Sequence, residues 1–408
     1  MTGPAVLVVG AGPAGLSAAR ELASRGISPV VVVDRETVAG GVPRHCDHTG
    51  FGLQDLHRPM TGPAYARHLT ARANDAGAVV RLATTVAGVS PAGEVTLVGP
   101  GGIDIVHPGA ILLATGARER PRSARLVPGD RPAGVFTTGQ LQQWVVLAGL
   151  PVGRRAVVVG AEHVAYSAVL TLRHAGVSTV AMVTELPRHQ TVPPFAWATR
   201  LGLRVPLRTS SRVSALHGHG RLEAVGVEDL VTGAIERVEA DTVVFTGDWM
   251  PDHELARRMA LMIDPATRGP RTDGWGRTSM AGVVAAGNLV HPGETAGIAA
   301  LGGRAAGRRL ADDLARGPLP VAGGVAVTVS QPLSSVVPAV VDPGELPERL
   351  LVRTDAFSGH RLVVARQGGR EVGRHRLRHS VPHRSLAVPT SVLAGLAPDG
   401  GPIELTLA

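Results

Sequence analysis

Short apolar runs alternate with a helix pattern along the first part of the chain. Residues 5–9 (AVLVV) and 29–34 (PVVVVD) are apolar runs of strand length, and between them residues 16–26 place apolar side chains at helical spacing up to Gly26. Apolar runs of this kind, separated by helices, are typical of parallel strands that are buried on both faces. The pattern predicts a strand–helix–strand unit with a right-handed crossover.

The same pattern returns in the middle of the chain. Residues 156–160 predict a strand, residues 164–176 a helix and residues 178–185 a second strand. Two further segments, 111–121 and 242–252, resemble each other, because each is an apolar strand that runs into a Thr-Gly turn. Paired segments of this kind indicate that one doubly wound Rossmann-like domain is inserted into another.

The pattern changes near the end of the chain. Residues 278–288 predict a strand that ends at a Gly-Asn turn, and residues 294–317 predict a long helix. Pro318 and Pro320 then mark a linker, and from Val325 onward only short β-like runs follow. The predicted fold class is therefore α/β, with two Rossmann-like dinucleotide-binding domains and a small all-β C-terminal domain, in which Gly368-Gly369 forms a hairpin turn.

Composition removes several classes of chemistry. The chain has 408 residues, of which 44% are hydrophobic and 18% charged, so it can bury several cores. It contains no lysine, which excludes a Schiff-base lysine and a P-loop. All 41 basic residues counted are therefore arginine, and with 33 acidic residues they give a formal net charge of +8. Nucleic-acid binding is not expected, because no helix-turn-helix, zinc or aromatic RNA motif accompanies this charge.

Cys46 is the only cysteine, so the chain cannot form an internal disulfide, a redox dithiol or a thiolate-held iron–sulfur cluster of its own. The histidines show no HExxH spacing, and we expect no metal site. No apolar run reaches the length of a membrane span, and no basic segment precedes the apolar residues that begin at Val6. We expect a cytoplasmic protein without a membrane span.

The first glycine motif carries the most specific signal. Gly10-x-Gly12-x-x-Gly15 follows a predicted strand and opens a predicted helix, and Asp34 ends the next strand. The three glycines permit a tight turn, a close approach of a pyrophosphate and close packing of helix on strand. The helix N-terminus favours phosphate, and Asp34 can accept a hydrogen bond from a ribose hydroxyl. The motif predicts FAD or NAD; the alternative is a tight turn without a ligand.

Four motifs together resemble those of the pyridine nucleotide–disulfide oxidoreductase superfamily of two-domain flavoproteins: GAGPAG with Asp34, the pair Gly40-Gly41, the turn Ala114-Thr115-Gly116, and AAGN at 285–288. The resemblance implies FAD in the first and last parts and NAD(P)H in the inserted part. It implies an FAD-binding domain over residues 1–120 and 248–317, an inserted NAD(P)-binding-like domain over 121–247 and the β-rich domain over 322–408.

The resemblance also implies the residues that hold FAD. Val86 would contact the adenine through its backbone, Asn288 would meet the ribityl chain in place of the usual aspartate, and the helix near Thr295 would point at the flavin. The implied set is Gly10, Gly12, Pro13, Ala14, Gly15, Asp34, Arg35, Gly41, Val86, Ala114, Thr115, Gly116, Gly287, Asn288 and Thr295.

The second glycine motif is altered. In Gly160-Ala161-Glu162, a glutamate stands where the second glycine belongs. A carboxylate there adds bulk and negative charge against a pyrophosphate, and a helix dipole contributes only about 0.3–1 kcal/mol per charge. We therefore expect NAD(P)H to bind weakly or not at all; the alternative is that Glu162 swings aside. If a nicotinamide cofactor binds, Glu185 at the end of the next strand favours NADH over NADPH.

Without a dithiol and with an altered second motif, the chain resembles one branch of the superfamily, the FAD subunits of two-component amine, opine and hydroxyproline dehydrogenases. This resemblance implies oxidation of the C–N bond of an amine or imino acid by hydride transfer to flavin. It also implies a small-molecule substrate and, as partner, a ferredoxin-like or second flavoprotein subunit. The alternatives are an NADH-dependent flavin reductase that passes electrons to a protein, and a non-catalytic FAD-binding scaffold.

The segment 40–52 gathers titratable groups after the Gly-Gly turn. Arg44 is a candidate to hold a substrate carboxylate, and His45 or His48 is a candidate base. His291 is a further catalytic candidate beside the Gly-Asn turn. The alternative for segment 40–52 is a solvated loop. The Arg- and His-rich run 369–384 is interpreted either as a docking face for an acidic partner or as the solvated face of a strand.

Overall fold

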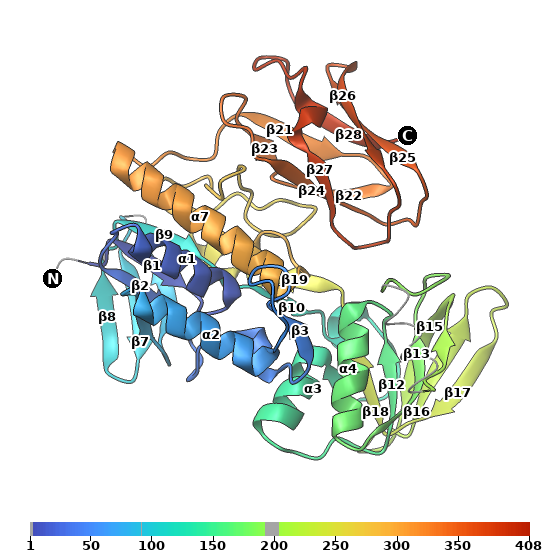
Figure 1. Ribbon diagram of the computed structural model, residues 1–408. Coiled ribbons are helices and arrows are strands. Elements are labelled where there is room, and N and C mark those ends of the chain that lie inside the picture. Colours follow the sequence, from blue (N-terminus) through green and yellow to red (C-terminus); the bar gives the residue numbers. More distant parts are fainter. Residues whose placement is uncertain (1–2, 91, 192–203) are drawn as a thin grey trace.

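The computed structural model describes residues 3–90, 92–191 and 204–408. Figure 1 shows an α/β part with helices α1 (Pro13–Ser24), α2 (Gly62–Asp75) and α7 (Ala296–Arg316), a second α/β part around helix α4 (His163–His174), and a part at the top that consists mainly of strands. Two Rossmann-like α/β units with parallel sheets and a C-terminal sheet region are thus present, which confirms the predicted fold class. The domain boundaries stay predictions.

A five-stranded parallel sheet, in the order β20-β9-β1-β2-β5, is the centre of the first domain. β1 lies between β2 and β9, with Val6 opposite Val30 and Ala110. β20 pairs with β9, so the chain leaves this sheet after β9 and returns to it only at β20. The strands are β1 Val6–Val9, β2 Val30–Val33, β5 Val79–Arg81, β9 Ala110–Leu113 and β20 Val283–Ala285. The strand predicted over 278–288 is shorter because residues 279–282 form bends and a turn.

Three helices cover one face of this sheet: α1 (Pro13–Ser24), α2 (Gly62–Asp75) and α7 (Ala296–Arg316). α1 and α7 approach each other through glycine. A Cβ at Gly303 would lie 2.0 Å from the carbonyl oxygen of Ala14, and a Cβ at Gly307 would lie 2.7 Å from that of Ala18. The two helices therefore run side by side, and the first turns of α7 extend beyond the start of α1.

The opposite face is covered by an antiparallel meander that the sequence analysis did not predict. Its strands are β6 (Thr85–Val89), β7 (Val95–Gly99) and β8 (Gly102–Val106). Val95 and Leu97 of β7 pack with Leu7 of β1 and with Met259, just after the short helix α6 (Glu254–Arg258). Alternate residues of β7 are buried, as expected of a strand with one face on a core.

The middle domain repeats the Rossmann pattern with the strand order β11-β18-β12-β13-β14. It joins the first domain through two antiparallel strands, β10 (Ala117–Glu119) and β19 (Trp249–Pro251). An antiparallel meander covers one face, and helices α3 and α4 cover the other. The bounds are β11 Val135–Thr137, α3 Thr138–Gln142 (continued by a π-helical turn, Gln143–Leu147), β12 Arg155–Val159, α4 His163–His174, β13 Ser178–Val183, β14 Leu207–Arg208, β15 Ser211–His217, β16 Ala224–Asp229, β17 Ile235–Glu239 and β18 Thr242–Phe245.

The C-terminal domain consists of two packed sheets, in the orders β23-β21-β28-β25-β26 and β22-β24-β27. Their facing side chains form one core, with Val352 from the second sheet and Val363 and Leu405 from the first. The predicted Gly368-Gly369 turn joins β25 to β26, and both glycines have positive φ. The strands are β21 Val325–Val329, β22 Leu333–Val337, β23 Val340–Val341, β24 Arg349–Thr354, β25 Arg361–Gln367, β26 Arg370–Leu377, β27 Leu386–Pro389 and β28 Ile403–Leu407.

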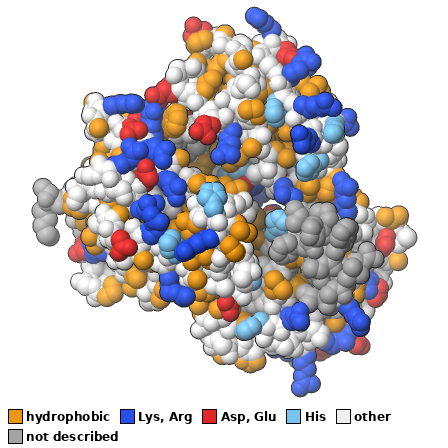
Figure 2. Space-filling view, viewed as in Figure 1, with side chains coloured by type: hydrophobic (Ala, Val, Ile, Leu, Met, Phe, Trp, Pro, Cys, Tyr) orange, Lys and Arg blue, Asp and Glu red, His pale blue; other side chains and the backbone are white. Residues whose placement is uncertain are grey.

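Strand β26 contains half of the Arg- and His-rich run. Arg374 and Arg376 are exposed while Leu377 is buried, which confirms the alternation predicted for a strand. β26 is the last strand of its sheet. Figure 2 shows arginine side chains spread over all parts of the visible face rather than gathered on this strand. A partner-docking role of β26 stays a prediction.

Ion pairs through Glu345 connect the C-terminal domain to Arg309 of α7 and to Arg277, which is itself paired with Asp313 of α7. Arg277 donates two hydrogen bonds to Asp313 of α7, at 2.9 and 2.8 Å, and Arg309 of α7 donates to Glu345 at 2.5 Å. The C-terminal domain also reaches the middle domain, where the amide of Gln190 donates to the carbonyl of Pro382 at 2.9 Å. In the part of the chain that the structure describes, no helix has the length and hydrophobicity needed to span a membrane.

Candidate nucleotide-binding and active site

The first glycine turn lies between β1 and α1 and leaves room for a ligand at one position. A Cβ at Gly10 would lie 2.4 Å from the carbonyl oxygen of Ala114, and one at Gly15 would lie 1.9 Å from that of Gly10. Both glycines are therefore required by the packing of the backbone. At Gly12 a Cβ would meet only the Cα of Gly41, at 4.0 Å. Gly12 is the N-cap of α1, and no side chain caps the helix there. The open space and the uncapped N–H groups fit a pyrophosphate.

Asp34 ends β2 beside this turn. Its carboxylate accepts hydrogen bonds from the backbone N–H of Ala11 at 2.6 Å and of Glu36 at 2.9 Å. These bonds hold the carboxylate between the turn and the chain that follows β2, where a ribose would lie. Arg35 is exposed next to it. The backbone carbonyl of Asp34 accepts from Thr84, which places β6 and Val86 near this end of the sheet.

The remaining predicted cofactor residues surround the same turn. A Cβ at Gly41 would lie 2.9 Å from the Cα of Gly12, and a Cβ at Gly287 would lie 2.6 Å from the Cβ of Ala14. Thr115 donates its hydroxyl hydrogen bond to the carbonyl of Asp252 at 2.8 Å, so the Ala114–Gly116 turn lies against the strand that returns from the middle domain. The carboxyl ends of β1, β9 and β20 thus meet in one crevice. The roles of these residues toward a cofactor stay predictions.

Helix α7 begins at this crevice. Thr295 is its N-cap, and its hydroxyl also donates to the side-chain oxygen of Gln54. Asn288 accepts from the backbone N–H of Glu294 at 2.8 Å and so holds the loop before the helix. The helix predicted over 294–317 therefore starts two residues later, at Ala296, and Glu294 precedes its N-cap.

Asp55 is a neighbour of this helix start that the sequence analysis missed. It is 8% exposed, and one carboxylate oxygen accepts from the hydroxyl of Tyr65 at 2.7 Å. The other oxygen has no hydrogen-bond partner and would lie 3.2 Å from a Cβ at Gly297. Burial and the contact with Asp55 raise the pKa of Tyr65. No local pattern in the sequence marks Asp55, because its position depends on how its loop folds over α7.

The predicted catalytic residues of segment 40–52 differ in their contacts with the protein. Arg44 donates to the carbonyl of Val38 at 2.9 Å and to Glu36 at 3.0 Å. His45 is 3% exposed, and neither ring nitrogen has a partner. Burial and then the charge of Arg44 lower the pKa of His45 to about 4, so the ring is neutral at physiological pH.

His48 and Cys46 connect the first domain to the middle domain. Nε2 of His48 lies 2.7 Å from the hydroxyl of Ser167 on α4, and the thiol of Cys46 donates to the amide oxygen of Gln142 on α3 at 3.2 Å. The amide of Gln142 in turn donates to Ser167 at 2.8 Å. Burial raises the pKa of Cys46 to about 12, so the thiol is not a nucleophile here. The roles of Arg44, His45 and His48 toward a substrate stay predictions.

His291 stands in a buried cluster with Glu294. His291 is 4% exposed, and its Nδ1 lies 2.9 Å from Oε1 of Glu294, although the ring is not aligned for a hydrogen bond. Two side chains of the C-terminal domain, Arg353 and Ser385, donate to the same oxygen. Burial alone would raise the pKa of Glu294, but the contacts with His291, Arg353 and Ser385 lower it to about 2. Burial lowers the pKa of His291. Sequence reasoning missed Arg353 and Ser385.

The second glycine turn has the same backbone plan as the first, but a side chain fills it. The carboxylate of Glu162 folds back into the turn, where Oε2 accepts from the backbone N–H of Ala161 at 3.0 Å and Oε1 accepts from the hydroxyl of Thr246 at 2.5 Å. A Cβ at Gly160 would lie 2.7 Å from Oε2, and a Cβ at Gly247 would lie 3.0 Å from Oε1. Burial raises the pKa of this carboxyl group. The side chain occupies the space between β12 and β18.

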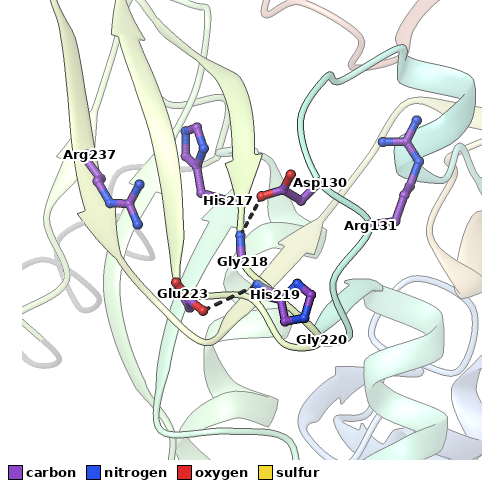
Figure 3. A pocket seen from close by; sticks show the side chains of 8 residues that line it. All are labelled: Asp130, Arg131, His217, Gly218, His219, Gly220, Glu223 and Arg237. Carbon is purple, nitrogen blue, oxygen red and sulfur yellow. Dashed lines mark hydrogen bonds between the residues drawn. The ribbon is translucent and has the colours of Figure 1, made fainter.

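Two surface hollows of the middle domain lie outside both glycine turns. The first, of about 570 Å³, is at the turn between β15 and β16, and its walls are polar (Figure 3). There Asp130 accepts from the backbone of Gly218 at 2.9 Å and Glu223 from that of His219 at 3.3 Å. The described residues contain no group of three or more His, Cys, Asp or Glu side chains arranged to hold a metal ion. The crevice of the first domain therefore remains the candidate site.

Comparison with known proteins agrees with this geometry. Residues 4–344 match the family described as pyridine nucleotide-disulphide oxidoreductase. The fold is similar to that of thioredoxin reductase from T. acidophilum, with a TM-score of 0.65 and 22% identity over 76% of this chain and 98% of that one.

Two curated relatives belong to oxidases of several subunits. The alpha subunit of sarcosine oxidase from Corynebacterium sp. (strain P-1) is 33% identical over 267 residues, which are 60% of this chain and 26% of that relative. An opine oxidase subunit from Agrobacterium tumefaciens (strain Ach5) is 26% identical over 321 residues, which are 69% of this chain and 60% of that relative. The chain thus spans about a quarter of the first relative and less than two thirds of the second.

Proposed function

The chain belongs to the pyridine nucleotide-disulphide oxidoreductase family of flavoprotein oxidoreductases, and from that premise we propose that it oxidises the C–N bond of an amine or imino acid. Hydride would pass from the substrate to FAD. The chain would act either as the enzyme itself or as the FAD subunit of a dehydrogenase.

The observation that carries this proposal is the carboxylate of Glu162 inside the second glycine turn. Its oxygens lie within hydrogen-bond distance of Ala161 and Thr246, in the space that a pyrophosphate would need. A second phosphate-bearing cofactor would meet the bulk of this side chain and, above its raised pKa, also its negative charge. A dithiol is also impossible, since Cys46 is the only cysteine. With neither NAD(P)H nor a disulfide as partner, the remaining source of electrons is an organic substrate.

The curated relatives support the choice of an amine. Both are named as subunits of oxidases, one of sarcosine and one of opines. From these names we infer an N-substituted amino acid as the substrate class. Because the chain spans only part of each relative, the activity of the whole assembly is part of the proposal.

The crevice of the first domain supplies suitable groups for FAD. The uncapped start of α1 would bind the pyrophosphate, Asp34 would accept from the ribose, and the segment around Gly287 and Asn288 would meet the ribityl chain. The start of α7, at Thr295, would face the flavin. Bound there, FAD supplies a two-electron acceptor for hydride.

Among the candidate bases, the geometry favours His291. Amine oxidation breaks the C–H bond next to nitrogen, whose electron pair leaves as hydride to FAD, and transfers the N–H proton to a base, so that a C=N bond forms. Nε2 of His291 has no partner among the described residues, whereas Nε2 of His48 is bound to Ser167. Burial lowers the pKa of both His45 and His291, and His45 also lies beside the charge of Arg44. Arg44, already paired with Glu36, would have to exchange that partner for a substrate carboxylate.

The electrons must then leave the flavin. With a single cysteine the chain cannot bind an iron–sulfur cluster by itself. We therefore include a ferredoxin-like or second flavoprotein subunit in the proposal as the immediate acceptor.

The test is anaerobic reduction of the FAD-loaded full chain, followed by flavin absorbance. A panel of N-methyl, N-carboxyalkyl and cyclic secondary amino acids is offered first, with an artificial acceptor for turnover, and NADH is offered separately. We expect at least one amino acid to bleach the flavin and NADH not to. Rapid stoichiometric bleaching by NADH would instead identify a reductase. FAD binding without reduction by any donor would favour a scaffold, and failure to take up FAD at all would overturn the proposal.

A further inference from the structure

We propose that the C-terminal β-domain completes the candidate active site, with Arg353 and Ser385 as positioning residues that hold Glu294 and, through it, the imidazole of His291. This inference rests on the proposed function for the role of the site in catalysis. Its geometry and its test do not require the cofactor. Both positioning residues lie beyond residues 4–344, the part of the chain that matches the family.

Two donors and the ring of His291 converge on one carboxylate oxygen. Oε1 of Glu294 lies 2.7 Å from Nη2 of Arg353 and 2.9 Å from Nδ1 of His291, and it also accepts the hydroxyl hydrogen bond of Ser385. Glu294 and His291 come from the loop between β20 and α7, and the other two come from the C-terminal domain. The cluster therefore forms only when the two domains are packed together.

The register of the second C-terminal sheet explains why these two residues meet. In β24, Leu350, Val352 and Thr354 face the core of the domain, so Arg353 lies on the opposite face. Leu386 of β27 pairs with Val352, which places Ser385 next to Arg353, and Nε of Arg353 donates to Ser385 at 3.3 Å. The side chain of Arg353 is nevertheless only 12% exposed, because this face of the sheet packs on the loop before α7.

A buried guanidinium needs a buried anion. Glu294 is the only carboxylate among the described residues with which Arg353 forms an ion pair, and the side chain of Glu294 is 8% exposed. Paired charges of this kind contribute to a defined geometry more dependably than to stability, and removal of one partner leaves the other uncompensated. The pair thus sets the position of the Glu294 carboxylate beside His291.

This carboxylate determines the state of the imidazole. Nδ1 is the ring nitrogen that faces Glu294, at 2.9 Å, and with the proton on Nδ1 the lone pair of the neutral ring lies on Nε2. The charged groups that act on His291 are Glu294, which raises its pKa, and Arg353, which lowers it together with burial. Loss of Arg353 would leave the carboxylate uncompensated, so His291 would take up a proton at higher pH and cease to be a free base.

The experiment is a pH titration of ¹⁵N-histidine-labelled full chain by NMR without added FAD, with the His291 signals identified by their loss in His291→Gln. In the parent protein we expect a neutral Nδ1–H ring that titrates below the exposed histidines. Arg353→Met should raise the midpoint by about 1 pH unit or more, since a removed neighbouring charge shifts a pKa by this order. Ser385→Ala should shift it less, and Arg353→Lys should partly restore it.

Arg376→Met is the matched control, because Arg376 is an exposed arginine of the same domain. If Arg353→Met and Ser385→Ala titrate like this control, the positioning role is wrong and the C-terminal domain only packs against the first. Should Arg353→Met not fold, Arg353→Lys and Ser385→Ala still decide the question. A chain that shows the shift but is not reduced by any amine would refute the proposed function and leave the positioning role standing.

Discussion

The two glycine turns of this protein have the same backbone plan, but the first is open at its N-cap position and the second is filled by a side chain. In each, a buried parallel strand is followed by a glycine with positive φ, +108° at Gly10 and +141° at Gly160. A helix of 12 residues comes next, and the side chain of its N-cap residue forms no capping hydrogen bond with the helix. At the N-cap of the first helix, Gly12 leaves the space open. At the N-cap of the second, Glu162 fills the space with its own carboxylate. A Rossmann unit can therefore be kept as a fold while one side chain removes its ligand site.

The third position of the motif separates the turns in a second way. A Cβ at Gly15 would lie 1.9 Å from the carbonyl oxygen of Gly10, whereas Ala165 already carries a Cβ at the corresponding place. Glycine at this position thus allows close contact of the first helix with its strand, whereas alanine adds a methyl group at the second. Close packing brings the N–H groups of α1 nearer to a bound phosphate, so both differences favour the first turn as the nucleotide site.

The largest expected effect comes from transferring the glutamate to the first turn. Gly12→Glu should weaken FAD binding by roughly two orders of magnitude, about 2.7 kcal/mol, because a carboxylate would face the pyrophosphate. The measurement is the FAD content of the purified protein and the Kd on reconstitution. Gly302→Ala serves as the control, because a Cβ there meets nothing within 4 Å and the residue lies in a helix. Undiminished FAD binding in Gly12→Glu would refute the assignment of the first turn.

The reverse exchange should open the second turn. Glu162→Gly should strengthen NADH binding by roughly thirtyfold, about 2 kcal/mol, because the charge and the block are removed together and glycine is accepted at an N-cap. NADH should bind more tightly than NADPH, since Glu185 follows β13. Titration calorimetry checks this, with Glu162→Ala as an intermediate that keeps the Cβ. Tight NADH binding by the parent protein would contradict the inference that Glu162 blocks the second turn.

A smaller effect is expected at the acid of the first turn. Asp34→Ala should weaken FAD binding about tenfold, about 1.4 kcal/mol, because the ribose loses an acceptor and Ala11 loses the bond that orders the turn. Asp34→Asn separates the two contributions, since its amide oxygen can replace only one acceptor. Equal FAD affinity in all three proteins would show that the carboxylate contributes nothing to FAD binding.

The smallest effect concerns the pH dependence of stability. Burial raises the pKa of Glu162 above its ordinary value, so the folded state holds this proton more tightly than the unfolded state. Stability from this group is therefore greatest at low pH and declines as pH rises above the usual range of a glutamic acid. Glu162→Gln should lose this decline, which thermal unfolding at pH 5 and pH 8 would reveal as a smaller difference in Tm than in the parent protein. An identical difference would show that the carboxylate is not desolvated.

Local patterns were sufficient for the elements that carry the crevice. The strands at 6–9 and 30–33, the helix from Pro13 and the helix up to Arg316 follow from apolar spacing and from glycine and proline positions. The antiparallel meanders were missed, because strands such as β6 and β8 are partly exposed and their pairing is decided by the sheet on which they pack.

The same distinction applies to the site, where a local motif identifies some residues and the packing of domains determines the contacts of others. The unusual residue Glu162 could be recognised from the sequence, because a motif of fixed spacing names the position that it violates. The contacts of His48 with Ser167 and of Arg353 with Glu294 could not, since they join residues 119 and 59 positions apart through the packing of separate domains. No periodicity records which faces of two domains will meet.

By itself the sequence determined which short-range units this protein builds, because hydrophobic spacing and glycine placement act within a few turns of chain. It also determined what chemistry is excluded, because absent lysines and cysteines cannot be supplied by folding. Only the tertiary structure decided where the charged side chains find their partners. A buried charge is stable only beside its counterpart, and that counterpart is brought into place by the packing of whole domains.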